Sequence, residues 1–175
     1  MNNSAKTVTR MGLFCVVLIL CSWCTLPFAI PFTLQLVGVF LCVGVLGGAQ
    51  ALGCILVYLA LGCLGLPVFA GFSGGIGVLL GPTGGFLLGF VPLCLVCGWW
   101  YPKAKKLWSK GLVFGVGLAI DYLAGTLWYC LVFTRGQASF LPAVAVCVLP
   151  FVLPDILKIV ASIYVLGHWK RGKLW

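Results

Sequence analysis

The feature that most constrains this chain is a long stretch without charge: there is no Asp, Glu, Lys or Arg from residue 11 to residue 102. Over its full length the chain is 63% hydrophobic and 7% charged, far below the charge of an ordinary soluble domain. A helix needs about 20 apolar residues to cross a bilayer, so this stretch has room for several crossings. Its apolar runs are continuous rather than alternating, which favours helices over the strands of a membrane barrel. We therefore predict an all-α integral membrane protein.

Prolines and glycines divide the apolar sequence into six expected transmembrane helices, within a single domain that covers residues 1–175. Proline interrupts helices, and paired glycines favour turns. Pro27 and Pro31 bracket a turn after the first span, and Gly47 with Gly48 forms the turn after the second. The expected spans are residues 10–26, 33–46, 49–64, 82–100, 111–133 and 154–169.

The tract of residues 65–85, between the third and fourth spans, is rich in glycine and also contains Pro67 and Pro82. It is interrupted too often for one straight helix and is too apolar for a loop in water. Irregular backbone at membrane depth survives only where protein covers it or where it lines a cavity. We therefore predict a glycine-rich, partly re-entrant loop that caps the outer side of the protein.

Basic residues lie in three clusters beside the apolar spans, at residues 6–10, 103–110 and 170–173. Lys and Arg gather on the cytoplasmic side of membrane proteins. Six crossings put all three clusters on one side, because an even number of spans separates each pair. We therefore expect both termini in the cytoplasm and basic residues against the lipid headgroups of the bilayer. Topology thus explains the net charge of +9, and we expect no nucleic acid partner.

Asp155 and Lys158 are an acid and a base inside the last apolar stretch of a chain that contains two acids in all. Ionisable groups within a membrane are costly and usually mark a binding or transport site. Pro150 and Pro154 precede them, so we expect a helix from residue 140 to break there and another to start near Pro154. Asp155 would then lie in the first helical turn, near the positive end of the helix dipole. The alternative is a self-neutralised ion pair that only holds two helices together.

Four groups of residues match, in order along nearly the whole chain, the pattern of one known family. They are the glycine-rich residues 65–75 with 81–86, residues 31–35 at the start of the second span, Tyr122 with Gly125 and Trp128, and residues 149–158. In these residues the chain resembles the BioY family, the substrate-binding membrane subunits of biotin transporters of the energy-coupling-factor type. The resemblance implies a six-helix fold with both termini in the cytoplasm. It also implies a vitamin pocket near the outer surface, roofed by the loops after spans one, three and five.

Biotin has an apolar bicyclic ring, a ureido group with two N–H donors and one C=O acceptor, and an anionic tail. Its pocket therefore needs a few polar partners and apolar walls. We expect Asp155 to accept a hydrogen bond from a ureido N–H, and Lys158 to supply positive charge or a donor nearby. The other expected contacts are Gln35, Ser73 and Tyr122 as polar groups, Phe32, Phe69 and Trp128 as walls, and Gly74 and Gly75 as loop residues that allow close backbone approach.

Asp121 lies midway along the fifth span, and its role stays open at the level of sequence. It faces the pocket, pairs with Lys158, or is buried in a neutral form.

The sequence thus predicts a biotin-capture subunit of the bacterial cytoplasmic membrane, which binds the vitamin at an outward-facing pocket and delivers it to the cytoplasm. The chain has no P-loop or other nucleotide motif, so the resemblance implies an energy-coupling transmembrane protein and ATPase subunits as separate chains. We expect no enzymatic activity, no metal and no cofactor. The same scaffold specific for another vitamin is one alternative, and a structural membrane protein without a ligand is another.

The cysteines offer an alternative among enzymes. Cys21 with Cys24, and Cys94 with Cys97, have C-x-x-C spacing in a chain of 10 cysteines. Thiols in apolar spans behave as small hydrophobic groups, and the two pairs fall in different spans, which argues against a shared zinc site. A membrane thiol oxidoreductase that uses Cys21 and Cys24 would need both thiols, whereas vitamin uptake would not.

Overall fold

The computed structural model describes residues 3–26, 32–137 and 139–171, and most of these residues are helical. The long helices are α1 (Asn3–Trp23), α2 (Gln35–Leu46), α3 (Gly48–Cys63), α5 (Gly84–Trp100), α6 (Leu107–Trp128) and α8 (Leu149–Arg171). The shorter elements are β1 (Thr25–Leu26), β2 (Phe32–Thr33), the 3-10 turns η1 (Ala70–Phe72) and η2 (Tyr101–Lys103), α4 (Ile76–Leu80), the π-helical turn η3 (Tyr129–Phe133) and α7 (Phe140–Cys147). The mostly helical class predicted from the sequence is confirmed.

Four helical segments in the described part of the chain are long and apolar enough to cross a membrane. They are Ala5–Trp23, Gly84–Lys103, Leu107–Phe133 and Leu149–Trp169. The helices α2 and α3 have 12 and 16 residues, which is less than the roughly 20 residues of a full crossing. Helices of crossing length thus occur at the first, fourth, fifth and sixth expected spans, while the count of six crossings stays a prediction.

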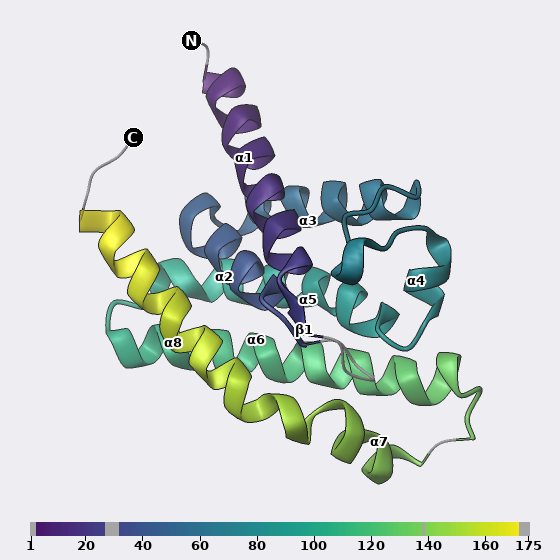
Figure 1. The fold of residues 1–175 in the computed structure, drawn as a ribbon. Helices are drawn as coiled ribbons and strands as arrows, with labels where there is room; N and C mark the ends of the chain where they lie inside the picture. The colour runs from purple at the N-terminus through teal and green to yellow at the C-terminus, as the bar shows by residue number, and fades with distance from the viewer. Residues whose placement is uncertain (1–2, 27–31, 138, 172–175) are drawn as a thin grey trace.

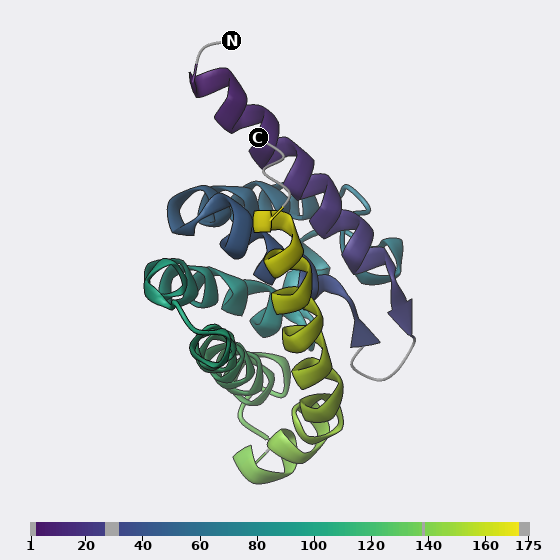
Figure 2. The ribbon, with the colours of Figure 1, turned by 90° about the vertical axis from the view of Figure 1, so that its left-hand side faces the viewer.

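The helices α5 and α6 lie side by side and run in opposite directions (Figure 1). Figure 2 views α6 nearly end-on and shows α8 running past it toward the C-terminus. The last turn of α8 and the α5–α6 connection lie on the left of Figure 1, whereas α4 and the α6–α7 connection lie on the right, and the first turn of α1 lies at the top. We call the first side the basic end, because Lys103, Lys105 and Lys106 lie in or beside the α5–α6 connection, and the other side the α4 end.

The core near the basic end is closely packed. Phe114 of α6 is fully buried between Phe40 of α2 and Tyr101 of η2, with ring centroids 4.3 and 4.7 Å away and the rings nearly parallel. Gly48 at the start of α3 meets Gly98 near the end of α5, and a Cβ atom added to Gly48 would lie 3.0 Å from the Cα atom of Gly98. Small residues allow such close helix packing in lipid. Direct contact between helices therefore holds this end together.

The glycine-rich tract folds over the ends of α1 and α3 at the α4 end. The indole Nε1–H of Trp23 donates to the C=O of Pro67 at 2.8 Å, and the N–H of Gly75 donates to the C=O of Gly62 at 2.7 Å. Gly75 has a φ of +95°, a conformation that glycine adopts without strain. The tract thus caps the bundle as predicted, while a re-entrant path through a membrane stays a prediction.

A short antiparallel ribbon joins α1 to α2. Thr25 of β1 lies opposite Thr33 of β2. The expected turn at residues 27–31 lies outside the described residues. The ribbon brings Phe32 and Thr33 to the start of α2, next to the site described below.

The expected restart of the last helix at Pro154 is wrong. The break lies at Val148, because α7 ends at Cys147 and α8 begins at Leu149. Pro150 falls in the first turn of α8, where a missing N–H breaks no helical hydrogen bond. Pro154 lies inside α8 and removes a single hydrogen bond, the one to the C=O of residue 150. Asp155 therefore lies in the second turn of α8 rather than at the positive end of the helix dipole.

Candidate functional site

A cavity of about 240 Å³ lies among the helices at the α4 end. This volume is slightly below the roughly 300–1,000 Å³ of pockets for drug-sized ligands, so the cavity suits a small guest. Its polar lining consists of Thr33, Gln35, Ser73, Thr83, Asp121, Tyr122, Asp155 and Lys158. Its apolar lining consists of Phe32, Leu36, Phe69, Ala70, Val78, Pro82, Phe86, Leu87, Phe90, Cys147 and Phe151.

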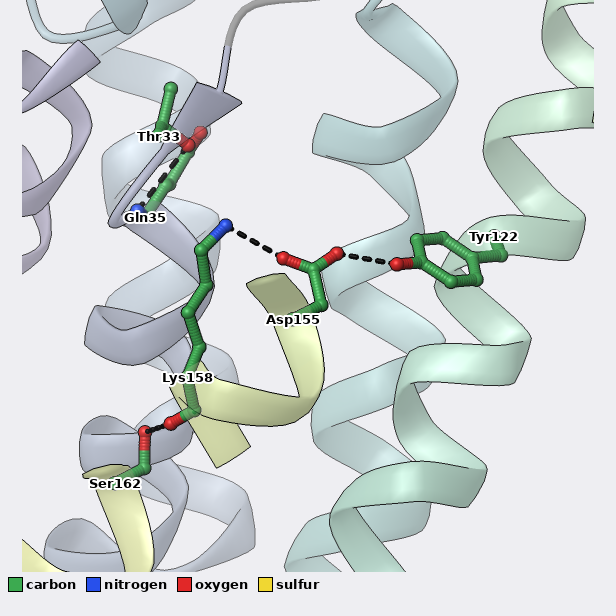
Figure 3. A network of polar contacts seen from close by, with 6 residues as sticks. All are labelled: Thr33, Gln35, Tyr122, Asp155, Lys158 and Ser162. Carbon is green, nitrogen blue, oxygen red and sulfur yellow. Dashed lines mark hydrogen bonds and ion pairs between the residues drawn. The ribbon is translucent and has the colours of Figure 1, made fainter. Parts of the chain in front are cut away.

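An ion pair between two residues of α8 forms part of the cavity wall (Figure 3). The Nζ atom of Lys158 lies 2.6 Å from Oδ1 of Asp155, and both side chains are buried. The Tyr122 hydroxyl of α6 donates a hydrogen bond to the other oxygen, Oδ2, of Asp155 at 2.5 Å. The three side chains form one network, which ties α8 to α6 at the level of the cavity.

The Lys158 side chain is held from two sides. Its Nζ atom lies 4.0 Å from the ring centroid of Phe32, close enough for a cation–π interaction. Figure 3 shows the side chain reaching from α8 toward the segment that carries Thr33 and Gln35. Lower on α8, the Ser162 hydroxyl donates to the C=O of Lys158 at 2.7 Å. The ammonium group is thus placed between Asp155 and β2, beside the cavity.

Gln35 forms a polar part of the wall at the start of α2. Its side chain is buried, and its Nε2 atom donates to the hydroxyl of Tyr58 in α3 at 2.7 Å. The backbone N–H of Gln35 donates to Oγ1 of Thr33 at 3.3 Å. The bond to Tyr58 fixes the direction of the amide group, and the bond to Thr33 holds the backbone at the start of α2, so Gln35 is a preorganised polar group.

Asp121 of α6 also lines the cavity, with 4% of its surface exposed. Its Oδ1 atom accepts no hydrogen bond from any residue in the described part of the chain. Lys158 pairs with Asp155 rather than with Asp121. Of the assignments left open by the sequence, the structure supports a position on the cavity and excludes the pair with Lys158.

Five of the eleven apolar residues in the lining are phenylalanines. Phe86 and Phe90 lie one turn apart on α5, and Phe151 lies one turn before Asp155 on α8. Phe69, from the glycine-rich tract, is almost fully buried beside Tyr58, with ring centroids 5.4 Å apart. A flat apolar guest would therefore meet ring faces and edges next to a small number of fixed polar groups.

Seven of the ten site residues predicted from the sequence line this cavity. They are Asp155, Lys158, Gln35, Ser73, Tyr122, Phe32 and Phe69. The other three lie in supporting positions outside the lining. Trp128 donates from Nε1 to the C=O of Gly81 at 3.2 Å, Gly74 lies against the backbone of Leu66, and Gly75 turns the loop.

The prediction missed several lining residues, including Thr83, Phe86, Phe90 and Phe151. Helical spacing gave a signal for some of them. Phe151 precedes Asp155 by four residues and Lys158 by seven, so it shares their face once α8 is known to begin before it. Phe86 and Phe90 also have a spacing of four, and therefore share one face of α5.

The structure gives no support for a metal or redox centre. No group of three or more His, Cys, Asp or Glu residues that could hold a metal ion occurs in the described part of the chain. Cys94 and Cys97 are buried in α5, and Cys24 is exposed after the end of α1. The described cysteines are free thiols, and Cys147 is the one that lines the cavity.

Comparison with known proteins agrees with the fold. The model of the BioY family matches residues 1–173. The chain is 36% identical to a biotin transporter BioY from Thermotoga maritima over 168 residues, which cover 95% of this chain and 96% of that one. It is 39% identical to a probable biotin transporter BioY from Pyrococcus horikoshii, with 78% of each chain covered. A crystal structure of the S-component for biotin from an ECF-type ABC transporter has the same fold, with a TM-score of 0.88, 98% of this chain and 95% of that chain covered, and 21% identity.

Proposed function

Because the chain belongs to the BioY family, we propose that it is a membrane component for biotin uptake, which binds biotin in the cavity at the α4 end and delivers it to the cytoplasm. The observation that carries this proposal is the Lys158–Asp155–Tyr122 network on the cavity wall. Buried charges are rare in an apolar membrane bundle and usually serve a ligand or a transport path. Relatives named as biotin transporters give that ligand its identity.

The chemistry of the cavity matches the parts of biotin. Asp155 accepts a ureido N–H, since each carboxylate oxygen can accept more than one hydrogen bond. Lys158 and Gln35 supply polar contacts beside it, and the aromatic wall covers the bicyclic ring. The family is one of transporters rather than enzymes, and the chain fits that class because its polar groups form a binding site.

The proposed topology has six crossings and both termini in the cytoplasm. The four long apolar helices support it, and α2 and α3 would complete the count as short crossings inside the bundle. The last turn of α8 lies on the same side of the bundle as the basic α5–α6 connection (Figure 1), and the positive-inside rule favours the cytoplasm for such basic segments. The cavity at the α4 end would then face outward from a bacterial cytoplasmic membrane.

The proposed partners are biotin, the lipid bilayer, and the coupling and ATPase subunits of an energy-coupling-factor transporter. The similar crystal structure is named as an S-component of such a transporter, which supports a shared assembly. The sequence contains no nucleotide-binding motif of its own. Energy from ATP would therefore reach this chain through other subunits.

Equilibrium binding of labelled biotin to the purified chain tests the function. We expect saturable binding, and an increase in Kd of about tenfold or more for Asp155→Asn and for Lys158→Ala, because each removes a hydrogen-bonded charged group. Lys103→Ala is the matched control, since Lys103 is an exposed base at the other end of the bundle. Unchanged Kd values in both site variants would remove the assignment. A different vitamin, identified by mass spectrometry in the purified protein, would replace biotin as the substrate.

A further inference from the structure

Asp121 is the buried ionisable group that the proposed contacts leave unused. It lines the cavity from α6 with 4% of its surface exposed, and its Oδ1 atom has no hydrogen-bond donor within the described part of the chain. Buried polar atoms in proteins almost always have a partner. An unpartnered carboxyl oxygen in a residue that lines a binding cavity makes that carboxyl group a candidate acceptor for a donor of the ligand.

Asp155 is in the opposite situation. Its Oδ1 atom is bound by Lys158 and its Oδ2 atom by the Tyr122 hydroxyl. A carboxylate can accept further bonds, but these two oxygens already have donors before a guest arrives. A cyclic urea has two N–H groups that point away from one another, so two acceptors on different walls suit it better than one. Asp155 on α8 and Asp121 on α6 provide such a pair.

Charge also decides which end of biotin lies near Asp121. Two acids and one base line the described wall of the cavity. Because Lys158 is paired with Asp155, this wall has no net positive charge to hold the anionic tail of biotin in either protonation state of Asp121, whereas a urea carries donors and no charge. The ureido end therefore lies between α6 and α8, and the tail points away from both carboxyl groups.

We propose that Asp121 is a specificity-determining residue, which accepts one ureido N–H of biotin while Asp155 accepts the other. This inference rests on the proposed function. It holds in either protonation state of Asp121, because a carboxyl group keeps acceptor capacity when it is protonated.

Gly89 of α5 provides the space that this role requires. A Cβ atom added at Gly89 would overlap Oδ1 of Asp121. Gly89→Ala therefore displaces the acceptor without changing any charge. It gives a second variant that is independent of the chemistry of Asp121 itself.

The test measures the Kd for labelled biotin with Asp121→Ala, Asp121→Asn and Gly89→Ala, all in the full chain purified in detergent. We expect Asp121→Ala to raise Kd by about tenfold or more, and Gly89→Ala to raise it as well. Asp121→Asn should raise Kd less than Asp121→Ala does, because its amide oxygen can still accept a hydrogen bond. Thr126→Val is the matched control: Thr126 is buried on the same helix, its Oγ1 also has no partner among the described residues, and it is not among the residues that line the cavity.

Competition with two biotin analogues, each methylated on one ureido nitrogen, gives a readout that a structural role would not change. Both analogues should bind the wild-type chain less tightly than biotin does. In Asp121→Ala, one of the two analogues should bind as well as biotin. Its methyl group replaces the N–H that donates to Asp121, and the variant already lacks that hydrogen bond. The proposal is overturned if Asp121→Ala and Gly89→Ala bind biotin like the wild type. It is also overturned if both analogues bind Asp121→Ala more weakly than biotin does, by the same factor in Kd as in the wild type. A wild-type chain that binds no biotin would instead overturn the proposed function.

Discussion

The two ends of the helix bundle differ in how the same helices are used. At the basic end, Phe114 of α6 stacks between two other rings in a closely packed core. At the α4 end, Asp121 lies two turns further along the same face of α6 and lines a cavity. A single helix thus provides packing at one end and a polar part of the cavity lining at the other.

This difference implies that stability and ligand affinity are controlled by separate residues. Packing and helix contacts at the basic end determine whether the bundle forms. The ion pair and its neighbours at the α4 end line the cavity in which binding is proposed. Substitutions at the two ends should therefore affect different measurements.

The largest effect is expected from Phe114→Ala at the basic end. Removing a fully buried ring that contacts two others should lower the free energy of unfolding by about 3–5 kcal/mol. Thermal unfolding in detergent measures this loss, and Leu112→Ala, at an exposed position of the same helix, is the control. The Kd for biotin of the protein that remains folded should stay the same. A large change in Kd with little loss of stability would contradict the separation of the two ends.

A smaller effect is expected from Tyr122→Phe at the α4 end. This change removes the hydroxyl that donates to Asp155 but keeps the ring, so Kd should rise by about threefold to tenfold with little change in melting temperature. Tyr164→Phe, at an exposed tyrosine of α8, is the matched control and should bind biotin like the wild type. Equal affinities for all three proteins would mean that the Tyr122 hydrogen bond does not contribute to binding.

The smallest effect is expected from replacing Cys21 and Cys24 together with Ala. The two thiols lie at the end of α1 and outside the lining of the cavity, so biotin uptake should be unchanged. Uptake of labelled biotin by cells that express the variant measures this directly. Loss of uptake in a variant that still folds would mean that these thiols contribute to uptake from outside the cavity, and Cys63→Ala, at an exposed cysteine of α3, controls for general effects of losing a thiol.

Much of the fold could be predicted from the sequence, because the features that determine it are local in the sequence. Lack of charge requires a membrane environment, and glycine or proline marks most helix ends, as Gly47 does between α2 and α3. The start of α8 was predicted wrongly because two prolines give the same local signal. The two prolines differ only in their position within the helix. Pro150 lies in the first turn and removes no helical hydrogen bond, whereas Pro154 lies further inside and removes one.

The polar half of the site was also predictable, since ionisable groups are too costly in lipid to be common. The aromatic half was not, because the chain contains 12 phenylalanines and most helices carry at least one. Nothing local distinguishes Phe90 on the cavity wall from Phe114 in the packed core. That difference depends on how far apart the helices lie at each level of the bundle.

The position of both ion-pair partners on α8 has a consequence for release of the substrate. Asp155 and Lys158 are three residues apart on one rigid element, so they travel together whenever α8 tilts or slides. Such a motion stretches the link between Tyr122 and Asp155, and leaves the two opposite charges in contact with each other. A carrier built in this way can reshape its pocket without separating a cation from an anion inside the bilayer, and that keeps the energy barrier of the transport step low.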